Sequence, residues 1–87
     1  MAIIRKKTWR DMFEKVLSGD KTFDVRLADF DVSEGDTLVL EEWDEEKQVY
    51  TGRKIEAKVG FVLKTKDLKF WPEADVAEHG YQVISLK

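Results

Sequence analysis

The sequence predicts an α+β domain with a mainly antiparallel, curled sheet. Three observations lead to this prediction. One segment near the N-terminus has the apolar spacing of a helix, while several short segments alternate between apolar and polar residues. The expected strands follow one another through hairpin-length connections, which favours pairing between sequence neighbours. A length of 87 residues fits one domain. We therefore expect a single domain over residues 1–87, in the order β-α-β-β-β-(short helix or loop)-β.

The composition indicates a folded chain without covalent staples. Hydrophobic residues make up 43% of the sequence, and there is no cysteine for a disulfide or a thiolate metal site. No long apolar run or signal-like N-terminus is visible. These features predict a soluble cytoplasmic protein, monomeric by default, with no membrane partner, no metal and no cofactor.

The net charge of −3 hides an uneven distribution. Residues 1–26 carry a charge of +3, residues 27–51 carry −8 and residues 52–87 carry +2. If the two basic ends meet in the fold, they form a basic face that suits an anionic partner. The alternative is a solvated surface on which charges of both signs are interspersed.

The first expected elements are an edge strand over residues 2–5 and a helix over residues 8–18. Thr8 has the character of an N-cap, and Gly19 suits the left-handed residue after the helix. Five apolar residues fall on one helical face, and they are Trp9, Met12, Phe13, Val16 and Leu17. We expect the last four to lie in the core. Trp9 fits the core and a binding site equally well.

Residues 21–27 read as the next strand. Phe23, Val25 and Leu27 alternate with three polar residues, so one face suits the core and the other faces outward. The outward residues are Thr22, Asp24 and Arg26.

The remaining chain predicts three more strands. An apolar run predicts a strand over residues 37–43, with a hairpin tip at residues 44–47 and a return strand from Val49, where Thr51 and Gly52 allow a bulge. Residues 53–64 alternate over a long span and bend at Gly60, as in a sheet that curls into a barrel. Residues 73–79 form a helical turn or a loop, and residues 81–86 form the last strand.

Several kinds of chemistry find no support in the sequence. The single histidine, His79, has no positioned nucleophile nearby, so a catalytic triad is not indicated. The acidic residues within 41–46 lack the spacing of a calcium loop and read as a solvated hairpin. The five glycines are scattered and form no phosphate-binding loop.

One motif carries a resemblance to a known family. Gly19-x-Lys21-x-x-Asp24-x-Arg26 resembles the Gly-x-Lys-x-x-Glu-x-Arg signature of ASCH domains. The turn into a strand at residues 32–38, the segments 40–44 and 50–53, and the closing residues 80–86 are similar to a small ASCH-related family of unknown function.

This resemblance implies a PUA-like fold, a small curled β-barrel with one N-terminal helix packed on it. It also implies a cleft that binds RNA or a nucleotide-like small molecule. Cationic side chains suit phosphate or base edges, and aromatic rings suit stacking on bases. The expected binding residues are Lys21, Thr22, Asp24, Arg26, Trp9 and Trp43, whereas Trp71 favours core or lid packing. The alternative is that Asp24 and Arg26 form one structural ion pair on an exposed sheet face.

Two other functions remain open at this point. Some ASCH proteins hydrolyse N-acylated cytidine with the motif lysine, a threonine at the motif's acidic position and a later glutamate. Lys21 matches this pattern, but Asp24 stands at the threonine position, so the hydroxyl nucleophile is missing. The catalytic candidates are therefore Lys21 and Asp24, and Glu73 and Glu78 match the later glutamate by order alone. The third function is a protein-interaction module whose acidic residues 41–46 face a basic partner. We expect binding rather than catalysis.

Overall fold

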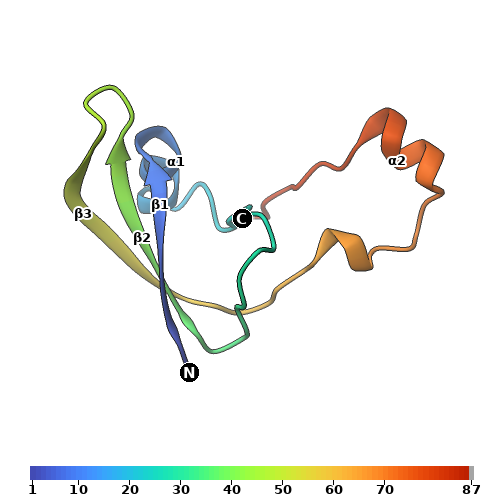
Figure 1. Cartoon of the computed structure of the whole chain (residues 1–87), viewed down its shortest axis with the longest axis horizontal. Coiled ribbons are helices and arrows are strands. Elements are labelled where there is room, and N and C mark those ends of the chain that lie inside the picture. The colour runs from blue at the N-terminus through green and yellow to red at the C-terminus, as the bar shows by residue number, and fades with distance from the viewer. Residues whose placement is uncertain (87) are drawn as a thin grey trace.

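A three-stranded mixed sheet organises the protein, whose computed structural model describes residues 1–86 (Figure 1). Strand β1 (Ile3–Trp9) leads directly into helix α1 (Arg10–Leu17), and β2 (Thr37–Asp44) and β3 (Val49–Lys58) form a hairpin. The order in the sheet is β1-β2-β3, with β1 parallel to β2 and β2 antiparallel to β3. A 3₁₀ turn, η1 (Thr65–Asp67), and helix α2 (Glu73–His79) follow.

The prediction of a mainly antiparallel PUA-like barrel is wrong. The sheet is open, with β1 and β3 as its two edges. The N-terminal element is strand β1, whose start corresponds to the expected edge strand at residues 2–5, and the helix follows it. Closing a barrel requires further strands to join these edges. After β3 the backbone of Val59 still exchanges hydrogen bonds with Gly35 and Asp36 just before β2, and beyond this point the chain leaves the sheet (Figure 1).

Local signals located the hairpin correctly. Strand β2 begins at Thr37 as expected, and the turn is built around the Asp44 carboxylate, which accepts from the backbone N–H groups of Glu46 and Lys47. The register shifts between Glu41 and Trp43, opposite the residues around Gly52, so the expected bulge is present.

Three expected strands differ from the structure. Residues 21–27 and 81–86 have no regular secondary structure, and β3 ends at Lys58 rather than at residue 64. Alternation predicts that a segment has two faces, but a strand also needs a neighbour with free backbone groups. The structure provides no such ladder for these segments.

Helix α1 starts later than predicted. Thr8 is the buried penultimate residue of β1, and Trp9 occupies the N-cap position without a side-chain cap. The helix packs on the sheet through Phe13, which is 1% exposed, while Met12 and Leu17 are exposed rather than in the core. Among the described residues the buried hydrophobic core consists of Phe13, Val39 and Leu40. With so small an apolar core, polar contacts have unusual importance in holding α1 to the sheet.

Candidate functional site

The turn after α1 brings the Gly19–Arg26 motif back toward β1. Gly19 has a φ of +87°, a conformation that glycine adopts without strain. The backbone N–H of Gly19 donates to the carbonyl of Val16, and that of Lys21 donates to the carbonyl of Lys15. These bonds end the helix and reverse the chain, so the motif runs beside the carboxyl end of β1.

Arg26 fixes the motif in place. Its Nε donates to Asp24 Oδ2 at 2.7 Å, Nη1 donates to the Lys7 carbonyl at 2.6 Å, and Nη2 donates to Thr8 Oγ1 at 2.8 Å. One planar guanidinium thus ties the motif to the last residues of strand β1. These bonds use three of the five N–H donors of the guanidinium, so Arg26 holds Asp24 and the motif segment in position against β1.

Lys21 lies on the other side of the same carboxylate. Its Nζ is 3.6 Å from Asp24 Oδ1, longer than a normal charge-assisted hydrogen bond. The Lys21 side chain is nearly buried, and its ammonium also lies 5.1 Å from the centre of the Phe23 ring. Asp24 therefore has one oxygen held by Arg26 and one that approaches Lys21 loosely.

These side chains line an open pocket of about 1030 Å³, which we call the motif pocket. The pocket lies between the end of β1, helix α1 and the motif segment. Its lining residues are Lys7, Thr8, Trp9, Asp11, Met12, Lys15, Asp20, Lys21, Phe23, Asp24, Val25 and Arg26. Four basic and three acidic side chains give the lining a net charge of +1, and Trp9 is 58% exposed. A pocket with an accessible aromatic ring and a few convergent polar groups suits a planar, partly polar ligand.

The six residues predicted to bind a ligand divide into two groups. Lys21, Asp24, Arg26 and Trp9 line the motif pocket. Thr22 does not, because its hydroxyl pairs with Ser85 Oγ at 2.6 Å and so joins the C-terminal segment.

Trp43 lies on β2 outside the pocket lining. The Lys7 ammonium is 3.8 Å from the centre of the Trp43 ring, and Tyr50 packs edge-on against that ring at 4.9 Å. Lys7 lines the pocket, so Trp43 contacts a lining residue without lining the pocket itself. Trp71 contacts Phe70 and Tyr81 in the C-terminal part of the chain rather than the site.

The burial of residues 21–27 follows the prediction at Thr22, which is exposed, and at Phe23, which is half-buried, but departs from it in the rest of the segment. Val25 and Leu27, expected in the core, are 66% and 79% exposed, while Asp24 and Arg26 are half-buried. The hydrogen bonds of Arg26 to β1 turn the polar side of the segment inward. The simple alternative of a surface ion pair is therefore incomplete, because this pair also bonds to the backbone of β1.

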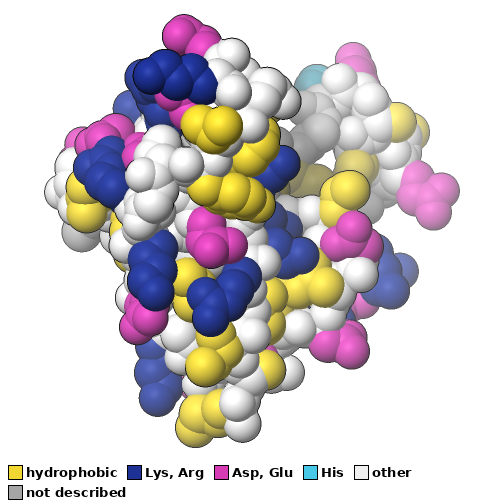
Figure 2. All heavy atoms as spheres, turned by 60° about the vertical axis from the view of Figure 1, so that its left-hand side comes forward, with side chains coloured by type: hydrophobic (Ala, Val, Ile, Leu, Met, Phe, Trp, Pro, Cys, Tyr) yellow, Lys and Arg dark blue, Asp and Glu magenta, His cyan; other side chains and the backbone are white. Residues whose placement is uncertain are grey.

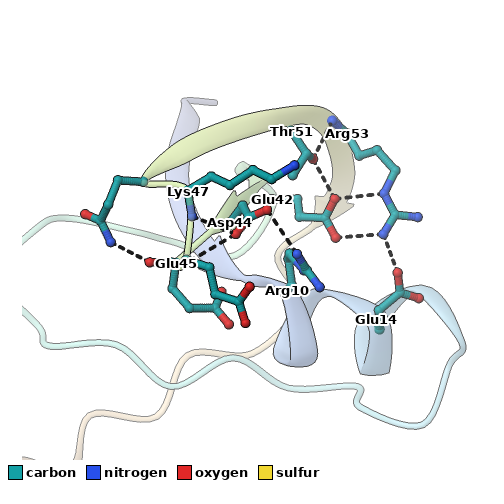
Figure 3. A network of polar contacts seen from close by, with 10 residues as sticks. Arg10, Glu14, Glu42, Asp44, Glu45, Lys47, Thr51 and Arg53 are labelled. Carbon is teal, nitrogen blue, oxygen red and sulfur yellow. Dashed lines mark hydrogen bonds and ion pairs between the residues drawn. The ribbon is translucent and has the colours of Figure 1, made fainter.

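A network of ion pairs lies on the other side of α1 (Figure 3). Glu42 on β2 is 4% exposed and accepts from Thr51 Oγ1 at 2.5 Å and from Arg53 Nε at 2.9 Å and Nη2 at 2.7 Å. Arg53 also pairs with Glu14 on α1. The hydrogen bond from Arg53 is the main cause that lowers the pKa of Glu42 to about 2, and the hydroxyl of Thr51 adds to it against the cost of burial. The two carboxylates in turn raise the pKa of Arg53.

The acidic run at 41–46 is therefore not a simple solvated hairpin. Asp44 is buried, and Arg10 Nη1 donates to its Oδ2 at 3.0 Å. Backbone N–H donors from Lys47 and Glu46, followed by Arg10, lower the pKa of Asp44. Two of the five acidic residues are thus neutralised within the fold, which weakens the case for a docking surface for a basic partner.

Sequence reasoning missed the contribution of β1 to the pocket. Lys7 and Thr8 supply the carbonyl and the hydroxyl that receive Arg26, and Asp11 and Lys15 line the helix side. The local signal for this contribution is the basic run at residues 5–7, but no pattern in the sequence indicates that Lys7 and Thr8 receive Arg26. On the face in Figure 2, basic, acidic and hydrophobic side chains are interspersed, so that face is not uniformly basic.

Residues 1–86 contain neither a cluster suited to a metal ion nor a helix suited to a membrane. No group of three histidine, cysteine or acidic side chains in this range has the arrangement of a metal site. No helix in the described part of the chain combines the length and apolarity needed to cross a bilayer.

Comparisons with known proteins identify relatives without an assigned activity. An uncharacterized 12.9 kDa protein in the GpA 3′ region of Escherichia phage P2 is 42% identical over 67 residues, which are 77% of this chain and 57% of the phage protein. The chain thus spans little more than half the length of that relative. No solved structure shows a significant match to the present chain. The model of a domain of unknown function, DUF3850, matches residues 5–85. Because this match extends over nearly the whole sequence, the chain belongs to the DUF3850 family.

Proposed function

We propose that the protein binds RNA or a nucleotide-containing small molecule in the motif pocket. One observation carries the proposal: Lys21, Asp24 and the exposed ring of Trp9 line a single pocket, and Arg26 holds Asp24 in a fixed orientation. The resemblance of the motif to ASCH domains supports the same conclusion. The family description and the phage relative name no activity.

Each side chain has a distinct part in the proposed complex. The Trp9 ring stacks on a base, an interaction that contributes about 1–3 kcal/mol per base in single-stranded complexes. Asp24 Oδ1, held only loosely by Lys21, accepts a hydrogen bond from an exocyclic amine of the base. Lys21 donates to a phosphate or a base carbonyl, and Arg26 keeps the carboxylate aimed at the ligand.

Titrations with a short single-stranded RNA and with the four ribonucleoside monophosphates test this proposal. We expect binding that weakens as salt increases, because contacts to phosphate release counterions. The variants Lys21→Met and Trp9→Leu should each weaken binding roughly tenfold or more. Lys54→Met is the matched control, since Lys54 is an exposed lysine on β3 outside the pocket lining. Equal affinity in all three variants would refute the assignment of the pocket.

Arg26→Lys separates positioning from direct contact. Lysine keeps the positive charge but cannot make the three bonds to Asp24, Lys7 and Thr8. We expect weaker binding with an unchanged salt dependence, because the number of phosphate contacts stays the same. A reduced salt dependence would instead mean that Arg26 contacts phosphate itself.

Hydrolysis of an N-acylated cytidine is the second candidate. The carboxylate of Asp24 beside the ammonium of Lys21 is the observation that favours it, since such a pair can activate water. Thr22, the nearest motif hydroxyl in sequence, pairs with Ser85 and lies outside the pocket lining. Release of acetate from N4-acetylcytidine that is lost in Asp24→Asn would support hydrolysis, and no release at high protein concentration would exclude it for this substrate.

A further inference from the structure

The C-terminal part of the chain forms an arm that extends away from the sheet. We define the arm as residues 59–86; in Figure 1 it includes η1, α2 and the two connections beside them. Both ends are bonded to the body. Val59 exchanges backbone hydrogen bonds with Gly35 and Asp36, and Ser85 pairs with Thr22. The arm is thus held in position at its two ends while its middle stands clear of the sheet.

The arm exposes large apolar side chains along its whole length. Phe61 is 86% exposed, and bulky residues from both connections and from the final segment are also open to solvent. The main examples are Phe61, Leu63, Phe70, Trp71, Ile84 and Leu86. No residue of η1 or α2 is buried. Apolar surface of this extent on a soluble chain marks an interaction surface.

The chain as a whole exposes more surface than a compact monomer of its mass. A folded monomer of 10.2 kDa has an accessible surface of roughly 5,300 Å² by the general scaling with mass, whereas this chain exposes 7159 Å². Its radius of gyration is 14.8 Å, compared with about 12 Å for a compact domain of this length. The excess surface is about 1,800 Å² per chain.

We propose that the arm docks on a second copy of this chain and forms a symmetric dimer. Burying the excess surface of both chains would give a total interface of roughly 3,600 Å², which falls within the 2,000–5,000 Å² of obligate homodimers. Interfaces of obligate homodimers are more apolar than those of transient complexes. The exposed apolar side chains of the arm fit an interface of this kind. In a two-fold arrangement each arm covers its partner in the same way, so the interface closes at two chains.

The charge of the arm favours a protein partner over a polyanion or a membrane surface. Residues 59–86 contain three lysines and four acidic residues, so the net charge is −1 with His79 neutral. RNA and anionic lipid headgroups attract surfaces with an excess of positive charge. A nearly neutral, apolar arm fits an identical arm and the apolar segment around Val25 and Leu27 in a second copy.

Analytical ultracentrifugation of the full chain between 1 and 200 μM tests the proposal, with small-angle scattering for the radius of gyration. We expect a monomer–dimer equilibrium or a stable dimer. Leu63→Asp should weaken dimerisation roughly 30-fold or more, because it places a charge in the apolar interface. Thr65→Asp is the matched control, since it adds the same charge at an exposed polar position of the same arm and should leave the equilibrium unchanged.

Further outcomes are equally decisive. If Leu63→Asp fails to fold by circular dichroism, Ile84→Asp provides the same test at the other end of the arm. A wild-type chain that stays monomeric at 200 μM refutes the proposal, whether its radius of gyration is near 12 Å, with the arm folded on its own body, or near 14.8 Å. Open-ended association, or equal weakening by Leu63→Asp and Thr65→Asp, refutes it as well.

Discussion

Replacing Glu42 by glutamine isolates the contribution of one buried carboxylate to folding. Glutamine has nearly the same shape as protonated glutamic acid and keeps one acceptor for Thr51 or Arg53. It removes the negative charge that Arg53 binds with two nitrogens. Arg53 is half-exposed and retains Glu14, so the substitution does not leave an isolated buried cation.

The size of the effect follows from the pKa of Glu42. Folding lowers this pKa from the ordinary value of 4.5 to about 2, so the ionised side chain stabilises the native state by about 3 kcal/mol at neutral pH. Because the pKa is lower in the folded state, this stabilisation is fully present above pH 4.5 and is lost as the pH falls toward 2. At pH 3 about 1 kcal/mol remains.

Urea unfolding, followed by tryptophan fluorescence, provides the measurement. The difference in the free energy of unfolding between wild type and Glu42→Gln should fall from about 3 kcal/mol at pH 7 to about 1 kcal/mol at pH 3. Other carboxylates titrate in both proteins and cancel in this difference. Glu41→Gln, at the adjacent and more exposed position of β2, is the control and should differ little from wild type at either pH. A difference for Glu42→Gln that does not change with pH would refute the electrostatic account.

Two further predictions concern the packing of the sheet. Phe13→Ala should lower the free energy of unfolding by about 3–5 kcal/mol in urea, because it empties the one fully buried position of α1, while Met12→Ala next to it should cost much less. Asp36→Asn should lower the Tm at pH 7, since the Asp36 carboxylate accepts from the N–H groups of Ala2 and then Ser33, which lower its pKa. That loss should shrink as the pH falls below the ordinary pKa of 3.8, and equal losses in Tm at pH 7 and pH 3 would contradict it.

The sequence predicted elements whose signals are local. Helix α1 was found from the spacing around Phe13 and from Gly19, and the hairpin from the apolar run before Asp44. A helical stripe, a C-terminal glycine and a polar hairpin tip each act within a few residues. The boundaries were less accurate, because Thr8 carries an N-cap signal but its backbone pairs in β1.

The sequence could not predict which side of the motif faces inward. Period-two alternation defines two faces in residues 21–27 and assumes that the apolar face is buried. In the structure Asp24 and Arg26 are half-buried while Val25 and Leu27 are exposed, because Arg26 finds acceptors on Lys7 and Thr8, which lie 19 and 18 residues away. Contacts at this separation depend on the fold. The grouping of Lys21 and Asp24 was accessible from the motif, whereas the contribution of β1 was not.

The two charged regions beside α1 have one structural role in common. A helix of eight residues is too short to be stable alone, and α1 places a single fully buried side chain, Phe13, on the sheet. Arg53 ties α1 to β2 from one side through Glu14 and Glu42, and Arg26 ties the segment after α1 to the end of β1. Two guanidinium groups therefore fix the walls of the motif pocket: Arg26 acts from within the lining, and Arg53 acts from outside it. The network around Glu42 is best understood as the support of that pocket rather than as a second site, since its cations and carboxylates already satisfy one another.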